Sequence, residues 1–303
     1  MRRFVNINSF ALKIIAMVTM AIDHFGVTMS SLWGITTQNE TFYHVCRYIG
    51  RFAMPLYCFM LVEGVIHTRN YKKYALRLGI MALLISTLLC IFEYVPSLGM
   101  TSLAGEGNIF LDLLLGSVLV YCLNHKNKLV KLIAIVPVGI AIFSFIAKGI
   151  EFSGSCYDCG YSTEYLWYPK FLRLQYDWLS IGLILGFYLS YPLTRLFFKI
   201  QAEKYGTQAD MEGTVDFRIA ANLISIIFLV VMSFLYYSVR YININYVWWD
   251  SSQQLFAMLA GILILGYSGL RGYNAKWFNI FTYAYYPLHI VLIYGICYLI
   301  YLI

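Results

Sequence analysis

Long apolar stretches separated by short charged clusters restrict the fold of this chain more than any other feature of its sequence. Each stretch is roughly 20 residues long, enough for a helix to cross about 30 Å of hydrocarbon. Of the 303 residues, 60% are hydrophobic and only 12% are charged, whereas about a quarter of the residues in soluble domains are charged. The sequence therefore predicts an all-α, polytopic integral membrane protein and excludes a soluble globular domain.

About nine of these stretches are expected to span the membrane as helices. Their approximate ranges are 9–32, 48–67, 74–95, 108–124, 129–149, 177–198, 217–238, 251–270 and 277–302. No small-residue cleavage site follows the centre of the first stretch, so we expect it to remain as a spanning helix and not to be removed as a signal peptide.

Lys and Arg residues are distributed unevenly between the alternating loops of this arrangement. With the N-terminus in the cytoplasm, the outer segments hold six of the 22 basic residues: Arg47, Arg51, Lys148, Lys170, Arg173 and Arg240. Cytoplasmic segments are expected to carry the excess. The sequence thus predicts a multi-pass protein of the plasma membrane with a cytoplasmic N-terminus and, because the helix number is odd, an outer C-terminus.

We expect one membrane domain over residues 1–303, with an outer loop at 151–176 and a cytoplasmic loop at 199–216. The net charge of +7 arises from basic residues at helix ends, where they meet anionic lipid, so no nucleic-acid partner is expected. The outer loop contains Cys156 and Cys159. No second pair of Cys or His follows at zinc-ligand spacing, so we expect no metal site and favour a local disulfide.

Asp23 and His24 form an ionisable pair inside the first apolar stretch. Ionisable side chains are costly in hydrocarbon, which makes both of them candidate functional residues. Neighbouring residues point about 100° apart on a helix, so one side chain can face the bundle while the other meets a neighbouring helix. His24 suits general-base work near neutral pH, with a carboxylate to orient it. The alternative is a histidine that only forms a hydrogen bond between helices.

The second apolar stretch carries charge at both ends. Arg47 and Arg51, four residues apart, are expected on one face at the outer boundary, where Arg51 could reach the level of His24. The alternative is an arginine that extends to the headgroups. At the inner end, Glu63 lies four residues before His67 and is a candidate membrane carboxylate.

A basic cluster follows that inner end, and it consists of Arg69, Lys72 and Lys73. Such a cluster would attract a phosphorylated cytosolic ligand. The alternative is that it serves only as the positive-inside signal.

The later stretches contain further polar residues, which are Asn108, Asp112, Asp177, Gln253, Gln254 and His289. Most of these residue types commonly form only hydrogen bonds between membrane helices. His289 stands out, because Pro287 precedes it near the middle of the last stretch and a proline frees a backbone carbonyl there.

Taken in order, these segments resemble the TraX family of membrane acetyltransferases, which is named for a protein that acetylates the N-terminus of conjugative pilin. The likeness rests on seven blocks, at 12–26, 47–78, 108–116, 176–189, 253–260, 267–272 and 285–300. The second block, RYIGRFAMPLYCFMLVEGVIHTRNYKKYALRL, is the most specific.

The resemblance implies transfer of an acetyl group from cytosolic acetyl-CoA to an acceptor reached through the membrane. Asp23 and His24 match the Asp-His pair of the family, Arg51 its Arg, and Glu63 its Glu-Gly carboxylate. Asp112 departs from the family pattern, in which an uncharged residue is usual at that position.

In the mechanism that we expect, His24 accepts a proton from the acceptor amine or hydroxyl, and Asp23 or Glu63 orients it. Arg51 or Asn108 stabilises the oxyanion. The residues expected to bind the acetyl donor, acetyl-CoA, are those of the basic cluster together with His67, Asn108 and His289.

Two other functions are compatible with the sequence. Carboxylates and histidines in the membrane also occur in proton-coupled transporters, although no inverted repeat is visible here. The second alternative is a non-catalytic component of a surface or conjugation assembly. The acceptor, which could be a pilin-like N-terminus, an envelope glycan or a lipid-linked precursor, is left open by the sequence, and so is a homodimer formed through glycine-rich faces.

Overall fold

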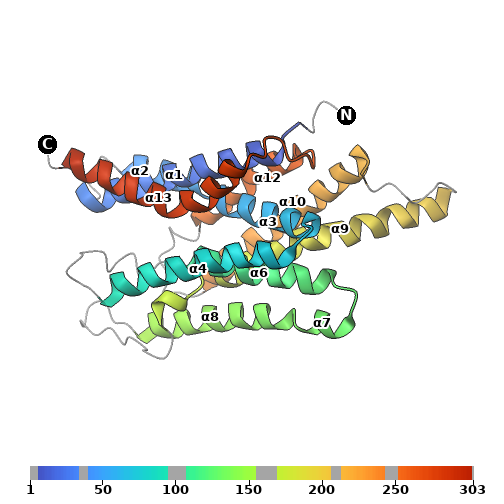
Figure 1. Ribbon diagram of the computed structural model, residues 1–303, viewed down its shortest axis with the longest axis horizontal. Coiled ribbons are helices and arrows are strands. Elements are labelled where there is room, and N and C mark those ends of the chain that lie inside the picture. The colour runs from blue at the N-terminus through green and yellow to red at the C-terminus, as the bar shows by residue number, and fades with distance from the viewer. Residues whose placement is uncertain are drawn as a thin grey trace. The chain divides into compact units, whose positions relative to one another are not determined.

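The computed structural model describes residues 6–33, 40–94, 107–154, 169–205, 213–242 and 252–301. Apart from short connections, the chain is helical throughout these ranges (Figure 1). The only β-type pairing within them is an isolated bridge between Ile7 and Tyr267. The α-helices are α1 (Ser9–Trp33), α2 (Glu40–Gly50), α3 (Ala53–His67), α4 (Tyr71–Tyr94), α6 (Ile109–Asn124), α7 (Lys128–Leu132), α8 (Ile135–Gly154), α9 (Asp177–Tyr205), α10 (Val215–Ile242), α12 (Ala260–Leu265) and α13 (Lys276–Tyr301). The 3-10 helices are η2 (Lys170–Leu172) and η3 (Gln254–Leu259). The predicted all-α class is confirmed for the described residues.

Seven segments of the described residues are long and apolar enough to cross a membrane. They are Ser9–Ser30, Thr41–His67, Tyr71–Ile91, Lys128–Lys148, Asp177–Lys204, Val215–Val239 and Lys276–Ile300. Two shorter apolar segments, Ile109–Asn124 and Gln254–Leu265, fall within the fourth and eighth predicted stretches. The chain is a multi-pass membrane protein, and the count of nine stays a prediction.

Several predicted boundaries were wrong. The second span begins with α2 at Glu40 and not at residue 48, so Arg47 lies well inside it. The fifth is interrupted between α7 and α8, because Pro137 cannot donate a backbone hydrogen bond and its ring opposes the carbonyl of Ile133. The eighth divides into η3 and α12. Finally, α9 continues to Tyr205, so the first part of the predicted cytoplasmic loop is helical.

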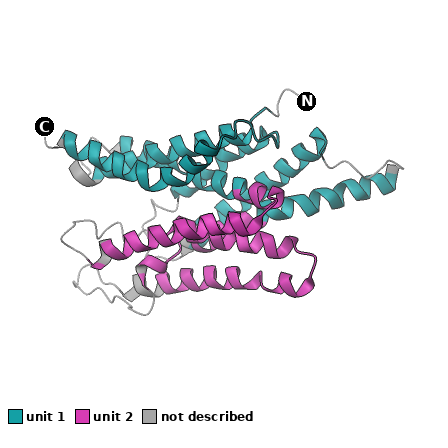
Figure 2. Ribbon diagram, in the orientation of Figure 1, with its two compact units in different colours: residues 1–60, 186–303 teal, residues 61–185 magenta. Residues whose placement is uncertain are grey.

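The chain divides into two compact units, residues 1–60 with 186–303 (unit 1) and residues 61–185 (unit 2) (Figure 2). The boundaries at residues 60 and 185 fall inside α3 and α9, two continuous helices. The division therefore does not separate two sequence domains, and the single membrane domain stays a prediction.

In unit 1, α1 packs between α2 and α13. Phe10 meets Phe278 with ring centroids 4.8 Å apart, and Tyr285 Oη donates to the carbonyl of Met17 over 2.8 Å. The order of these contacts shows that α1 and α13 run in the same direction. Glycines let α2 approach α1 closely, since a Cβ added at Gly50 would overlap Asp23.

In unit 2, α6 packs against α4, α7 and α8. Its apolar core is formed by Leu119, Cys122, Ala134, Ala141, Leu174 and Ile181. Tyr71 at the start of α4 stacks on Tyr121 near the end of α6, with ring centroids 3.9 Å apart.

Within each unit, segments that the sequence assigns to one side of the membrane lie together. In unit 1, Ile7 N–H donates to Gly266 O over 2.8 Å and Ser9 N–H donates to Leu270 O over 2.8 Å. In unit 2, Asn108 N–H donates to Arg173 O over 2.9 Å. Both sets agree with the predicted alternation of loops. Which side faces the cytoplasm stays a prediction from the Lys and Arg distribution.

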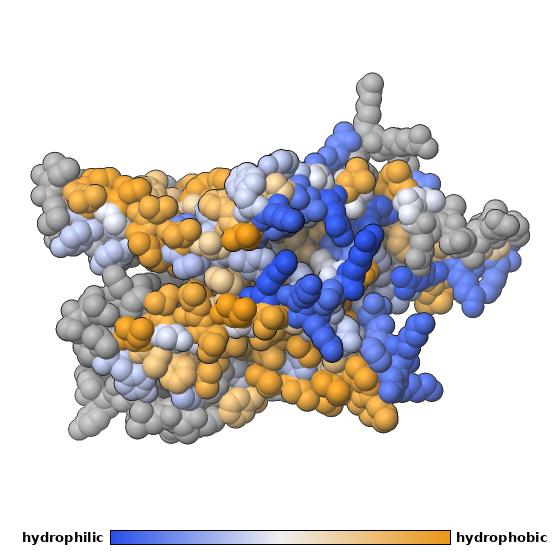
Figure 3. All heavy atoms as spheres, in the orientation of Figure 1, coloured by the Kyte–Doolittle hydropathy of each residue, from blue (hydrophilic) through white to orange (hydrophobic). Residues whose placement is uncertain are grey.

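Hydrophobic residues cover much of the visible surface (Figure 3). The described helices expose large apolar side chains along their lengths, among them Leu83 (70% exposed), Ile135 (74%), Ile262 (70%) and Val291 (70%). Lipid chains are the natural environment for such a surface, because an aqueous protein rarely exposes so much contiguous apolar area.

Candidate functional site

Two histidines from opposite ends of the sequence meet inside unit 1. His24 lies on α1 and His289 on α13, and Nε2 of His289 is 2.8 Å from Nδ1 of His24. Their rings are stacked with centroids 4.8 Å apart. His289 is also 2.8 Å from a backbone carbonyl, that of Tyr285 one turn earlier, through its Nδ1 atom. We call His24, His289 and the Tyr285 carbonyl the histidine relay.

The Tyr285 carbonyl determines the tautomers of a neutral relay. A carbonyl oxygen can only accept, so Nδ1 of His289 must carry the proton of this hydrogen bond. Nε2 of neutral His289 then has a lone pair and accepts from Nδ1–H of His24. Nε2 of His24 is left as the proton acceptor of the chain. The geometry can therefore make His24 a general base.

The sequence prediction for the orienting group was different. We expected Asp23 or Glu63 to orient His24, but the hydrogen-bond partner at Nδ1 is the imidazole of His289. Asp23 Oδ2 instead accepts from Nη1 of Arg47 on α2 over 2.8 Å. The angular separation of neighbouring helix positions explains the outcome, because Asp23 faces α2 while His24 faces α13.

Two guanidinium groups, those of Arg47 and Arg51, lie near the histidine relay. Arg47 and Arg51 both lie within electrostatic range of His24. Arg51 lies in the turn between α2 and α3, where Nη2 donates to Oε1 of Gln253 over 3.3 Å. The amide of Gln253 in turn lies 3.3 Å from Nδ1 of His44. Positive groups at this position can stabilise negative charge that develops close to His24.

His44 is a site residue that sequence reasoning missed. The helical spacing of His44, Arg47 and Arg51 was the available signal, since residues three and four apart share a face. Tyr48 of the same helix stacks on Phe256 of η3 with ring centroids 4.0 Å apart. This contact holds η3 against α2 and brings Gln253 within reach of Arg51.

The C-terminal end of α3, which belongs to unit 2, carries two further predicted residues, Glu63 and His67. Glu63 is buried, and Nδ1 of His67 lies 2.9 Å from its carbonyl and 3.8 Å from its carboxylate Oε2. Arg69, Lys72 and Lys73 are exposed at the junction of α3 and α4. The basic cluster is thus accessible to an anion.

Asn108 caps α6, and its side chain has three partners within unit 2. Oδ1 accepts from Phe110 N–H over 3.0 Å, while the amide donates to Ala82 O over 2.7 Å and to Ser86 Oγ over 2.9 Å. Both amide hydrogens are engaged. These contacts favour a structural role over the predicted oxyanion or donor-binding role.

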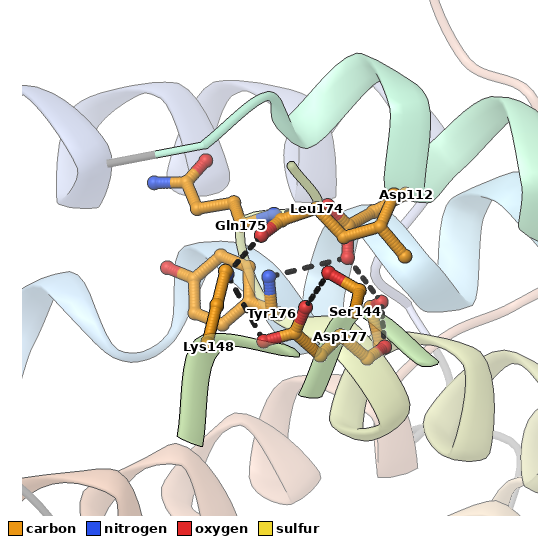
Figure 4. Close-up of polar contacts among 8 residues, drawn as sticks. Asp112, Ser144, Lys148, Leu174, Gln175, Tyr176 and Asp177 are labelled. Atoms are coloured by element: carbon orange, nitrogen blue, oxygen red, sulfur yellow. Dashed lines mark hydrogen bonds and ion pairs between the residues drawn. The ribbon is translucent and has the colours of Figure 1, made fainter. Parts of the chain in front are cut away.

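Asp112, one turn further along α6, is fully buried in a second polar cluster (Figure 4). Its carboxylate accepts from the backbone N–H of Gln175 (2.7 Å) and of Tyr176 (3.2 Å) and from the hydroxyl of Ser180. The departure of Asp112 from the family pattern therefore coincides with a carboxylate that holds the chain entering α9.

Asp177 begins α9 beside this cluster with a positive φ of 50°. Its carboxylate accepts from Ser144 Oγ and from Nζ of Lys148, which lies 3.0 Å away. Lys148 also donates to the carbonyl of Leu174. Lys148 therefore neutralises Asp177, and the arrangement does not resemble a substrate site.

A metal centre finds no support in the part of the chain that the structure describes, since no group of three His, Cys, Asp or Glu side chains is placed to hold an ion there. Cys156 and Cys159, with most of the predicted outer loop, lie outside the described residues. The proposed disulfide between them stays a prediction.

Comparison with known proteins gives two matches. A family model described as TraX protein matches residues 9–155, which includes the first three blocks of the resemblance and excludes the four later ones. The chain is also 32% identical over 118 residues to the "Probable fimbrial assembly protein FimC, serogroup H1" of Dichelobacter nodosus. That alignment covers 38% of this chain and 46% of the relative. No solved structure matches.

Proposed function

We propose that this chain is a TraX-type membrane acetyltransferase, which transfers the acetyl group of acetyl-CoA to an amine or hydroxyl acceptor. The match over residues 9–155 supports the family, since it includes the block with Arg51 and Glu63. The histidine relay carries the catalytic part of the proposal. Its hydrogen bonds run in one direction and leave Nε2 of His24 as a proton acceptor, which is what a general base requires.

The proposed step uses His24 as the general base. As the acceptor nitrogen or oxygen bonds to the thioester carbonyl carbon, Nε2 of His24 takes its proton. The C–S bond then breaks, and the CoA sulfur leaves with that proton as a thiol. His289 stabilises the imidazolium of His24 through their hydrogen bond, as the third group of a catalytic triad does.

Arg51 is proposed to stabilise the oxyanion of the tetrahedral intermediate. Its guanidinium acts electrostatically on His24 and is fixed by Gln253, and a fixed cation stabilises developing charge without reorganisation. Arg47 is a poorer choice, because Asp23 already neutralises it. We therefore assign Asp23 and Arg47 the role of positioning α2 against α1.

The donor is proposed to enter from the cytoplasm, where acetyl-CoA is available. Exposed cations at the start of α4, Lys72 and Lys73 with Arg69, can meet its phosphates. Glu63 and His67 precede this cluster on the last turns of α3 and are proposed to hold it in place.

A fimbrial or pilin-like N-terminus is the acceptor that we favour. The support is the name of the Dichelobacter nodosus relative, which refers to fimbrial assembly. The same name favours a second function, a non-catalytic component of a fimbrial assembly. The two differ in whether His24 is required beyond folding.

Mass spectrometry of envelope proteins and glycans tests the proposal. Cells would carry the intact protein, no protein, His24→Ala, or His125→Ala as a control that removes an imidazole outside the relay. We expect an acetyl mark that is present with the intact protein and with His125→Ala and absent from the other two. If fimbriae assemble normally with a stably expressed His24→Ala protein and no acetyl mark differs, the non-catalytic function is correct.

A further inference from the structure

Two like charges lie within electrostatic reach of each other at the end of unit 1 where α1 begins. Lys13 on the first turns of α1 is partly buried and lies within electrostatic reach of Arg271, which is exposed before α13. Neither forms an ion pair with a carboxylate of the described residues. Two cations held together repel each other, and an anionic ligand would offset this repulsion.

The backbone fixes these two cations relative to each other. Phe10 N–H donates to the carbonyl of Arg271 over 3.1 Å, and Ser268 N–H donates to Ile7 O over 2.8 Å. Gly269 (φ +76) and Gly272 (φ +69) allow the loop to turn back onto the start of α1. Backbone hydrogen bonds therefore fix the main chain of Arg271 beside the start of α1.

The same loop packs onto a third cation, Arg218 at the start of α10. Its guanidinium lies over the rings of Tyr191 and Tyr267, at 5.6 Å and 5.4 Å, and Nη1 donates to Tyr191 Oη over 2.8 Å. The Cα of Gly269 lies against this guanidinium, where a Cβ would come within 2.9 Å of Nη2. Arg218 thus supports the loop that presents Arg271.

Lys13 and His24 occupy one stripe of α1. Eleven residues at about 100° each make three turns plus about 20°, so the two side chains share a face, with Met17 and Met20 between them. The rise over eleven residues is roughly 16 Å. An extended pantetheine arm, which separates the phosphates of CoA from its sulfur, is of similar length.

We propose that Lys13 and Arg271 bind a phosphate group of the CoA thioester, at a distance from His24 that an extended pantetheine arm can span. This inference rests on the proposed function. It adds a phosphate site in unit 1, where the histidine relay lies. A phospholipid headgroup offers the same phosphate chemistry, so the test must separate the two sources.

The test measures CoA binding by titration calorimetry on the full-length protein in nanodiscs of zwitterionic lipid. We expect Lys13→Gln and Arg271→Gln each to weaken CoA binding about tenfold, the loss of one charge-assisted contact. Lys13→Arg and Arg271→Lys retain the charge and should stay within about threefold of the wild type. They also control for folding. Unchanged CoA affinity in both Gln variants would overturn the site.

A second arm separates phospholipid from CoA. If Lys13→Gln and Arg271→Gln change only the binding of the protein to phosphatidylglycerol in nanodiscs, the cations meet lipid and the inference is wrong. A third arm uses turnover with a truncated thioester, S-acetyl-N-acetylcysteamine, which has no phosphates. Here the Gln variants should raise KM for acetyl-CoA and leave turnover of the truncated donor unchanged. Equal losses with both donors would count against phosphate binding.

The outcomes also separate this inference from the proposed function. Loss of CoA binding in the Gln variants, without any acetyl transfer by the wild type, would keep the phosphate site and reject the catalytic proposal. Acetyl transfer that depends on His24 but is unaffected by Lys13→Gln and Arg271→Gln would keep the catalytic proposal and reject the phosphate site.

Discussion

Arg47 on α2 and Asp23 on α1 form a salt bridge in which Nη1 lies 2.8 Å from Oδ2. The two side chains are only 17% and 14% exposed, so most of their hydration has been lost. Removal of one partner from such a pair leaves the other charge buried without compensation. The pair therefore governs how α2 packs next to the helix that carries His24.

The two single substitutions in this pair are expected to cost more stability in sum than the double substitution costs. Asp23→Asn or Arg47→Gln should each cost about 3 kcal/mol, because the remaining buried charge loses this ion pair. The double variant should cost less than the sum of the two. A double-mutant cycle on unfolding free energies in mixed detergent micelles measures the difference.

The exposed pair Lys199 and Glu203 is the matched control for that cycle. Its atoms are 3.9 Å apart and its side chains are 68% and 67% exposed. Substitution of either residue should change stability by less than about 0.5 kcal/mol. Additive effects in the Asp23 and Arg47 cycle would show that the salt bridge contributes nothing.

Gly50 provides an independent test of the same helix contact. A methyl group there would overlap the Cβ of Asp23, whereas at Gly139 on α8 nothing lies within 4 Å of an added Cβ. Gly50→Ala should therefore destabilise the protein by about 1–3 kcal/mol through overpacking. Gly139→Ala should be neutral or stabilising, because alanine is the better helix former. Thermal unfolding of both variants measures this, and equal melting temperatures would contradict the close approach.

The sequence predicted the helical class and the alternation of loops, because apolar length and Lys and Arg placement act locally. It did not predict where helices break. Pro137 interrupts the fifth span through the carbonyl of Ile133, while Pro287 lies inside the continuous helix α13. Tertiary packing decides between these outcomes, and a single sequence does not contain that information.

The sequence identified the two histidines of the candidate site but not the contact between them. His24 and His289 were both singled out as ionisable groups in hydrocarbon, yet they are 265 positions apart in the sequence. No local periodicity links such positions. The carbonyl of Tyr285 has no sequence signal, because every residue has one. Only the three-dimensional structure could therefore show in which direction the hydrogen bonds of the relay run.

His289 is expected to be a positioning residue whose loss lowers the rate without abolishing binding. His289→Ala should reduce kcat for acetyl transfer by about 100-fold or more, the usual contribution of an oriented general base. The KM for acetyl-CoA should change little, because His289 meets His24 and not the phosphates. Steady-state kinetics on purified protein measure both values.

His289→Gln tests whether a hydrogen-bond acceptor at this position is enough to restore activity. Its amide could still accept from His24 Nδ1–H, so part of the rate should return. A rate with His289→Ala equal to that of the wild type would remove the relay from the mechanism, provided that the variant keeps the wild-type melting temperature.

Asp112 allows a prediction about the chain that enters α9. Its carboxylate accepts from two backbone N–H groups and from Ser180. Asp112→Asn places an amide donor against at least one of these donors, which should cost about 1–3 kcal/mol. Ser180→Ala removes only one hydroxyl and should cost less. Hydrogen exchange at Gln175 and Tyr176 should accelerate more in Asp112→Asn than in Ser180→Ala. Equal exchange in the two variants would show that the carboxylate does not hold this segment, because Asp112, and not Ser180, accepts from both amides.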